Sequence, residues 1–210
     1  MLLLAGLGNP GPKHAHNRHN IGFMAADAIA RRWRFSPERS RFQSLAAEGT
    51  VDTPAGPVRA LLLKPQTWMN ESGRAIGEAA KFFKVEPAQV VVFYDEIDMA
   101  PGRFRMKTGG GAAGQNGVRS MISQLGPDFR RGRMGVGHPG DPQLVHGHVL
   151  SDFHKADLVW LEPMLRAVAD AVPFALAGDD ERYQAEVMRL APAAKFSPRQ
   201  TAQNAARSED

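Results

Sequence analysis

Polar side chains that could move a proton or polarise a carbonyl group occur in three loops, each of which follows an expected strand. The loop GNPGPKHAHNRHN contains Asn9 and His19, and the loop KPQTWMNESG contains Asn70. The third region combines YDEID at a strand end with the glycine-rich GGGAAGQNG, and it contains Asp95 and Asn116. Ligands of open α/β sheets bind outside the carboxyl ends of the strands. If the three loops converge there, they form a pocket lined by amides with one imidazole and one carboxylate.

The residue types present limit the reaction that such a pocket could catalyse. Neither Ser nor Cys stands at a nucleophile elbow, since ESG at 71–73 lacks the first glycine of G-x-S-x-G. The histidines do not have the spacing of H-E-x-x-H or a comparable metal motif. A histidine and a carboxylate are suited to activating water, because a neutral imidazole with a pKa of about 6.5 accepts a proton and the carboxylate holds its tautomer. Asparagine NH2 groups can then donate to the charge that develops on a carbonyl oxygen.

Each of these residues also has a structural explanation when it is taken alone. A single loop histidine such as His19 is more often a surface or structural residue than a base. Asn9 before Pro10 could simply shape a turn, and Asp95 could cap a helix or pair with an arginine. The glycine run could be a flexible loop, although consecutive backbone N–H groups also form an anion-binding concavity. The spacing of these residues alone is compatible with a functional site and with residues that only stabilise the fold.

Three glycines near the N-terminus, Gly6, Gly8 and Gly11, match the dinucleotide-binding pattern G-x-G-x-x-G. The preceding strand is expected at residues 2–5, but the helix that should begin at the third glycine is not. Prolines on both sides of Gly11 disfavour a helix there, and a pyrophosphate needs an open helix N-terminus. The acidic residue expected about twenty positions later would be Asp27, inside a predicted helix. The pattern therefore does not predict a dinucleotide enzyme.

Positive charge is concentrated in one segment of the chain. The formal net charge is +4 with an isoelectric point of about 9.7. Residues 102–133 contain seven Arg and Lys side chains against one Asp, a local net charge of +6. Such a segment is either a solvated basic surface or a phosphate-binding face for a polyanion such as RNA.

Strand and helix signals alternate, which predicts one α/β domain over residues 1–191. Strands are expected at residues 2–7, 43–52, 58–65, 89–98 and 130–139. Helices are expected at residues 22–33, 70–85, 117–125, 156–178 and 180–191. Pro163 and Pro173 should break or kink the fourth helix. Residues 192–210 become small, polar and charged, which is typical of a mobile C-terminal tail.

The bulk composition is that of an ordinary globular protein, with 210 residues, 43% hydrophobic and 23% charged. The absence of cysteine excludes disulfides and thiolate metal sites. No apolar run approaches the ~18 residues that a membrane span requires, and the N-terminus lacks the features of a signal peptide. We therefore expect a cytoplasmic protein that does not contact a membrane.

Five blocks of sequence together resemble bacterial peptidyl-tRNA hydrolases. They are GLGNPG…NRHNIGF, LLLKPQTWMNESG, YDEIDMAPGRFRMKTGGGAAGQNGVRS, RMGVGHPGD and VLSDF, and they follow the family's order over residues 2 to about 153. The resemblance implies a single α/β domain, a twisted mixed β-sheet flanked by α-helices. It also implies hydrolysis of the ester between a peptide and the 3′ ribose of tRNA, which frees tRNA for translation. No metal or organic cofactor is expected, and the protein is expected to act as a monomer.

The resemblance also implies roles for matching positions. His19 matches the family's general base, Asp95 the carboxylate that orients it, and Asn9 the residue that helps to distinguish peptidyl-tRNA from aminoacyl-tRNA. The positions that contact the substrate's acceptor end are matched by Trp68, Asn70 and Asn116, with His14 where the family usually has tyrosine. The positions that hold tRNA phosphate are matched by Arg105, Lys107 and Arg133.

Two departures from the family pattern concern the handling of substrate and protons. Gln115 replaces a histidine that is usual in the family, and His14 removes a phenol from the pocket rim. Because His19, Asp95 and the asparagines remain, we expect the chemistry to be retained. The alternative is a catalytically weak or inactive RNA-binding protein on the same scaffold, although such a protein has no need of a base and its orienting carboxylate.

Overall fold

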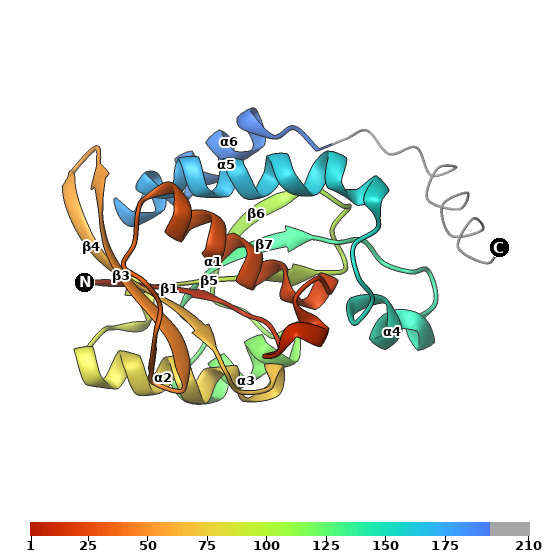
Figure 1. Ribbon diagram of the computed structural model, residues 1–210, viewed down its shortest axis with the longest axis horizontal. Helices are drawn as coiled ribbons and strands as arrows, with labels where there is room; N and C mark the ends of the chain where they lie inside the picture. Colours follow the sequence, from red (N-terminus) through yellow and green to blue (C-terminus); the bar gives the residue numbers. More distant parts are fainter. Residues whose placement is uncertain (194–210) are drawn as a thin grey trace.

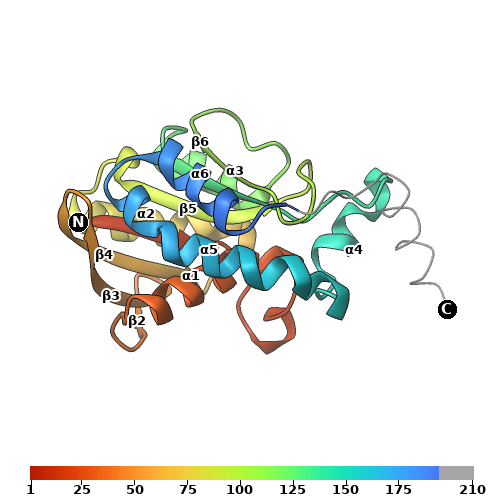
Figure 2. The same ribbon diagram turned by 90° about the horizontal axis from the view of Figure 1, so that it is seen from above.

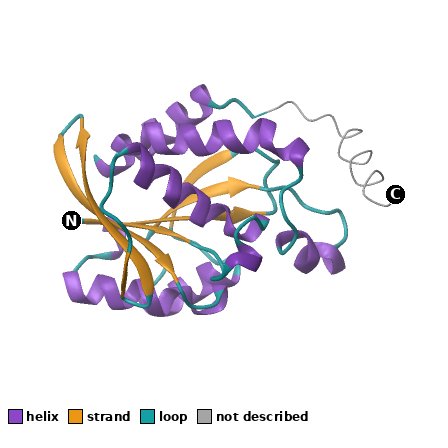
Figure 3. Cartoon of the chain, viewed as in Figure 1, coloured by secondary structure: helices purple, strands orange, loops and turns teal. Residues whose placement is uncertain are grey.

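The computed structural model describes residues 1–193, so most of the predicted tail, residues 194–210, lies outside the described residues. A seven-stranded sheet forms the centre of the molecule, in the order β2-β3-β4-β1-β5-β7-β6 (Figures 1 and 3). The strands are β1 Leu2–Gly6, β2 Arg39–Arg41, β3 Ser44–Thr53, β4 Gly56–Pro65, β5 Val90–Glu96, β6 Phe104–Thr108 and β7 Arg130–Gly135. The four central strands β4, β1, β5 and β7 are parallel, whereas β2, β3 and β6 pair antiparallel with their neighbours. The prediction of a mixed α/β sheet is confirmed.

Helices cover both faces of the sheet, with α1, α5 and α6 on one face and α2 and α3 on the other (Figure 1). Figure 2 shows the short helix α4 at the end of the molecule away from the N-terminus. The helices are α1 Ile21–Arg32, α2 Ser72–Phe83, α3 Asn116–Leu125, α4 Val145–Val149, α5 Leu158–Leu176 and α6 Asp180–Leu190. None of the helices within residues 1–193 combines the length and apolarity that a membrane crossing needs.

The central strands are buried on both faces, as parallel strands covered by helices require. All seven residues of β5 are buried. Side chains alternate along β1, so that Leu3 packs in the core under α2 and α3 while Leu4 packs in the core under α1 and α5. The two cores fix the sheet from both sides and so hold the strand ends where the loops of the site begin.

Gly6 and Gly22 allow close packing of backbones. A Cβ atom on Gly6 would lie 2.2 Å from the carbonyl oxygen of Gly22, and a Cβ on Gly22 would lie 2.3 Å from that of Phe93. These glycines therefore let α1 approach the backbones of β1 and β5. After Gly11 the chain forms two 3₁₀ turns, Pro12–His14 and Arg18–Asn20, and α1 does not begin until Ile21. The chain thus lacks the helix N-terminus that the dinucleotide pattern needs at Gly11.

Several elements differ from the sequence-based expectation. The strands β2 and β6 and the helix α4 were not predicted. Of the predicted break or kink in the fourth helix, the break does not occur, because α5 runs through Pro163 and Pro173 as one helix of 19 residues. Ten residues of α5 are buried, and this apolar packing outweighs the cost of about 3 kcal/mol for each internal proline.

Candidate active site

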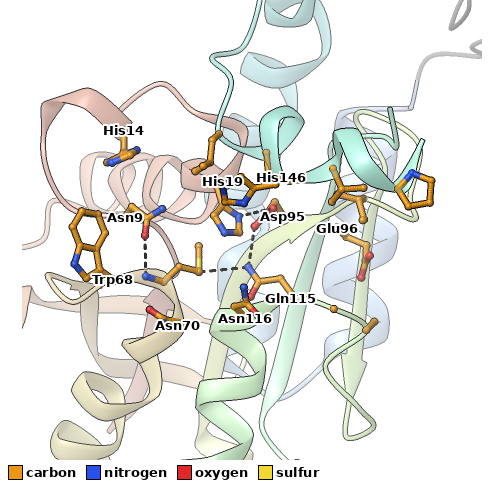
Figure 4. A pocket seen from close by; sticks show the side chains of 18 residues that line it. Asn9, His14, His19, Trp68, Asn70, Asp95, Glu96, Gln115, Asn116 and His146 are labelled. Atoms are coloured by element: carbon orange, nitrogen blue, oxygen red, sulfur yellow. Dashed lines mark hydrogen bonds and ion pairs between the residues drawn. The ribbon is translucent and has the colours of Figure 1, made fainter. Parts of the chain in front are cut away.

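A pocket of about 640 Å³ opens beyond the carboxyl ends of β1, β4 and β5 (Figure 4). The three loops predicted from the sequence converge there, together with the glycine-rich loop before α3 and the helix α4. Seven of the ten predicted site residues line this pocket: Asn9, His14, His19, Trp68, Asn70, Asp95 and Asn116. The three predicted cations, Arg105, Lys107 and Arg133, lie outside its lining.

His19 and Asp95 form a hydrogen-bonded pair in this pocket. His19 lies in the 3₁₀ turn Arg18–Asn20 that leads into α1, and its Nδ1 is 2.8 Å from Oδ2 of Asp95 near the end of β5. The side chain of Asp95 is only 2% exposed. Since a carboxylate can only accept, Nδ1 donates, and Nε2 of the neutral ring is left as an acceptor. His19 thus has the tautomer that a base toward the pocket requires.

Two opposing effects set the proton affinity of His19. Burial lowers its pKa, but the charge of Asp95 and the hydrogen bond to it outweigh burial, so the pKa is raised above its ordinary value. A raised pKa makes the imidazole a stronger acceptor for a proton from water. It also increases the fraction of His19 that is protonated at neutral pH and cannot accept a proton.

Asp95 is held from its other oxygen by Gln115. Gln115 precedes α3 as its N-cap residue, and its Oε1 accepts a hydrogen bond of 2.9 Å from the backbone N–H of Val118. Its Nε2 donates to Oδ1 of Asp95 at 3.0 Å. Both oxygens of the buried carboxylate are therefore bonded, one to His19 and one to Gln115 (Figure 4).

Asn9 is fixed by the backbone around it. Its Oδ1 accepts a hydrogen bond of 2.8 Å from the N–H of Met69, which orients the amide. Its own backbone N–H donates to Oδ1 of Asn20, and Nδ2 of Asn20 donates back to the carbonyl of Asn9, both at 2.9 Å. The side chain of Asn20 thereby ties the loop after β1 to the turn that carries His19. Within residues 1–193 the Asn9 NH2 group has no hydrogen-bond partner, so it is a donor available to a ligand.

The remaining predicted residues of the pocket lie around its rim. Trp68 is 56% exposed, and its ring meets that of His14 edge-on at a centroid distance of 5.9 Å. Nδ1 of His14 is 2.9 Å from Oδ1 of Asn17, so the imidazole occupies a fixed position on the rim. Asn116 accepts a hydrogen bond of 3.0 Å from Nη1 of Arg119, which leaves its NH2 group as a donor. A nucleotide base can stack on the exposed indole of Trp68, and the nearby amide donors can bind a carbonyl group beside that base.

The basic segment divides into structural and exposed cations. Arg131 is fully buried and donates to the carbonyls of Gly110 and Gly111, which shapes the glycine-rich loop, while Arg130 pairs with Asp180. Arg105 and Lys107 of β6 are exposed. The net charge of +6 therefore overstates the charge available to a polyanion.

Arg133 of β7 is only partly available to a ligand. It lies opposite Arg105 in the strand register, and its guanidinium is 3.1 Å from Oε2 of Glu96. Glu96 also lines the pocket. Arg133 therefore lies between the pocket and the exposed side chains of Arg105 and Lys107 on β6.

Sequence reasoning missed the outer wall of the pocket. Its apolar part comes from α4 and nearby residues: Ile97, Pro142, Val145, Val149 and Leu150. The segment is held by Arg18, whose guanidinium lies 2.8 Å from Oγ of Ser151 and 2.8 Å from Oδ2 of Asp157. The motif VLSDF contains Ser151, but nothing in its pattern pointed to a contact with NRHN more than 130 residues earlier. His146 of α4 also lines the pocket and was not predicted.

Comparison with known proteins agrees with this geometry. A family model described as peptidyl-tRNA hydrolase matches residues 3–195. The peptidyl-tRNA hydrolase of Phenylobacterium zucineum (strain HLK1) is 72% identical over 209 residues, covering 100% of both chains. That of Caulobacter vibrioides (strain NA1000 / CB15N) is 67% identical, covering 97% of this chain and 100% of the relative. The crystal structure of peptidyl-tRNA hydrolase from Acinetobacter baumannii matches with a TM-score of 0.83 at 32% identity, covering 89% of this chain and 94% of that one. The chain belongs to the peptidyl-tRNA hydrolase family.

Proposed function

We propose that this protein hydrolyses the ester bond between the peptide and the tRNA of peptidyl-tRNA, with His19 as the base that activates water. The observation that carries the proposal is the His19–Asp95 pair, in which Nδ1 donates to a buried carboxylate at 2.8 Å and Nε2 remains an acceptor in a pocket. The family membership supports the same reaction. It does not favour an RNA-binding protein that has lost hydrolysis.

In the proposed reaction Nε2 of His19 takes a proton from a water molecule as its oxygen attacks the ester carbonyl carbon. The resulting imidazolium is stabilised by the charge of Asp95. When the tetrahedral intermediate breaks down, the bond between the carbonyl carbon and the 3′ oxygen of the ribose is cleaved, and the imidazolium returns its proton to that oxygen. The products are a tRNA with a free 3′ hydroxyl and a peptide with a free carboxylic acid, which releases its proton to water to give the carboxylate. No covalent intermediate with the protein is required.

Asn9 supplies the proposed discrimination between substrates. Because Met69 holds its oxygen, Asn9 presents an NH2 donor to the pocket. The carbonyl oxygen of a peptide bond accepts such a donor, whereas the α-ammonium group of an aminoacyl-tRNA is itself a donor and repels it. Asn70 and Asn116 line the same pocket, and their NH2 groups are proposed to donate to the substrate's acceptor end.

The tRNA is proposed to pass from the pocket across Arg105 and Lys107. These exposed cations lie on β6, next to Arg133 and its partner Glu96 at the pocket edge. Such contacts position a nucleic acid through its phosphates and release counterions. We propose that the active form is a monomer in the cytoplasm, where translation supplies the substrate.

The test is the release of N-acetyl amino acid from N-acetyl-aminoacyl-tRNA by the purified protein. Unblocked aminoacyl-tRNA is the matched control substrate, since it differs only in the acetyl group on the amine. We expect rapid cleavage of the blocked substrate and at least tenfold slower cleavage of the unblocked one. Binding of tRNA without cleavage of either substrate would contradict the proposal.

A further inference from the structure

Gln115 lies between two groups that demand opposite hydrogen-bonding partners. The backbone N–H of Val118 needs an acceptor, and Oδ1 of Asp95 needs a donor. A carboxamide meets both demands in one orientation only, with Oε1 toward Val118 at 2.9 Å and Nε2 toward Asp95 at 3.0 Å. The two contacts agree, so the amide orientation is determined by its surroundings.

The packing around Gln115 is close. Its Nε2 also lies 3.5 Å from Sδ of Met69, the residue whose N–H holds Asn9. A Cβ atom on Gly117 would lie 2.5 Å from Sδ of Met69 and 3.0 Å from Oε1 of Gln115. Gly117 therefore leaves the space in which Gln115 and Met69 meet. The amide cannot rotate away without disturbing this contact.

We propose that Gln115 is a positioning residue for the proposed reaction, and that its amide holds Asp95 so that Oδ2 remains the acceptor for Nδ1 of His19. The N-terminus of α3 fixes the Gln115 amide, the amide fixes the Asp95 carboxylate, and the carboxylate fixes the His19 imidazole. Because a carboxamide has no proton that titrates near neutral pH, the number of donors to Asp95 stays constant over the working range. This inference rests on the proposed function only for its kinetic test.

The charged and titratable groups that line the pocket with His19 come from three elements. Asp95 and Glu96 belong to β5, His14 to the loop after β1, and His146 to α4. Glu96 is paired with Arg133 at 3.1 Å. Gln115, from the N-terminus of α3, contributes a donor without charge. A carboxylate placed at position 115 therefore changes the charge beside Asp95 and leaves the other groups as they are.

Two variants separate positioning from helix capping. In Gln115→Glu the side chain keeps its shape and its acceptor for Val118, but its second oxygen faces Oδ1 of Asp95. The two carboxyl groups would lie about 3 Å apart in a buried site, so they would share one proton. Their second ionisation adds a negative charge beside the imidazolium, so we expect the NMR titration midpoint of His19 to move to higher pH. In Gln115→Asn the residue remains a good N-cap, but its amide is one methylene too short for Asp95. We expect kcat to fall about tenfold with KM changed less than twofold.

Gln124→Glu is the matched control, because it makes the same chemical change at the other end of α3. It should leave both the His19 titration and kcat unchanged. A merely structural role would lower the melting temperature of Gln115→Asn and leave its kcat at the wild-type value. The proposal is overturned if Gln115→Glu leaves the His19 midpoint at the wild-type value, or if Gln115→Asn keeps the wild-type kcat. The NMR measurement needs no substrate, so it tests Gln115 even if the protein fails to hydrolyse peptidyl-tRNA.

Discussion

Replacing Asp95 by Asn is expected to reverse the tautomer of His19 while leaving the shape of the site intact. Nε2 of Gln115 is a donor 3.0 Å from Asp95, so the oxygen of the new amide must stay toward Gln115. The NH2 group then faces Nδ1 of His19, which in the wild type lies 2.8 Å from Oδ2. Two donors cannot bond each other, so the imidazole proton moves to Nε2. The nitrogen that faces the pocket loses its lone pair and with it the ability to accept a proton from water.

The size of the effect follows from this loss of the base. Exchange of the carboxylate of an Asp–His pair for an amide lowers kcat by about 10³–10⁴-fold, or roughly 4–5.5 kcal/mol. We expect a loss of this order for Asp95→Asn in hydrolysis of N-acetyl-aminoacyl-tRNA, with tRNA affinity changed less than threefold. Asp98→Asn is the control, because Asp98 is an exposed carboxylate three residues along the chain. A kcat for Asp95→Asn within threefold of the wild type would refute the tautomer argument.

The same variant changes how stability depends on pH. The pKa of His19 is raised in the folded protein, where burial opposes the larger combined effect of the charge and hydrogen bond of Asp95. The pair therefore stabilises the fold fully below the unfolded pKa of about 6.5 and loses this contribution as pH rises through the folded value. Asp95→Asn should cost more free energy of unfolding at about pH 5.5 than at about pH 8.5. Urea denaturation at both pH values measures the difference, and an equal or reversed cost would contradict it.

Three further variants test the Asn9 donor in the pocket, the phosphate contacts of β6, and the contacts of Arg18 with the segment after α4. Asn9→Asp keeps the acceptor for Met69 but loses the NH2 donor, so hydrolysis of blocked substrate should fall about 10–100-fold and the preference over unblocked substrate should shrink; an unchanged preference places the discrimination elsewhere. Lys107→Glu should flatten the plot of log affinity for tRNA against log salt by about 0.7–0.9 for each lost phosphate contact, whereas Arg59→Glu on the distant β4 should not, and equal slopes would move the tRNA away from β6. Arg18→Ala removes a side chain that is 7% exposed and leaves Asp157 with its other hydrogen bonds but without a cation, so urea denaturation should show a loss of about 3 kcal/mol, and a loss under 1 kcal/mol would mean that the Arg18 contacts are dispensable.

The sequence contained enough information to place the loops of the site. Asn9, His19 and Asp95 each follow or end a strand with a clear apolar signal, and parallel strands bring their carboxyl ends to one edge. The local sequence pattern could not reveal the hydrogen bonds that connect one loop to another. The contact from Gln115 to Asp95 depends on where α3 begins, and the pairing of Asn20 with the backbone of Asn9 depends on tertiary position.

The elements that were missed carry weak local signals. The strand β6 consists of FRMKT, in which Phe104 and Met106 alternate with Arg105 and Lys107, but an alternation over five residues is a short signal. Its N–H groups are met by α6, since Met106 donates to Oε1 of Gln184 at 2.9 Å, a contact that no local pattern predicts. The helix α4 has only five residues, too few to show a period. The continuity of α5 through Pro163 is decided by packing on the sheet.

The most direct test of the account is a comparison of wild type and His19→Ala on N-acetyl-aminoacyl-tRNA, with kcat and tRNA affinity measured on the same preparations. The imidazole acts mainly in the transition state, so the account predicts that His19→Ala loses most of its turnover, on the order of 10³-fold, while the Kd for tRNA stays within about threefold. Circular dichroism and urea denaturation establish that the variant is folded. A folded His19→Ala protein with near wild-type kcat would contradict the assignment of His19 as the base.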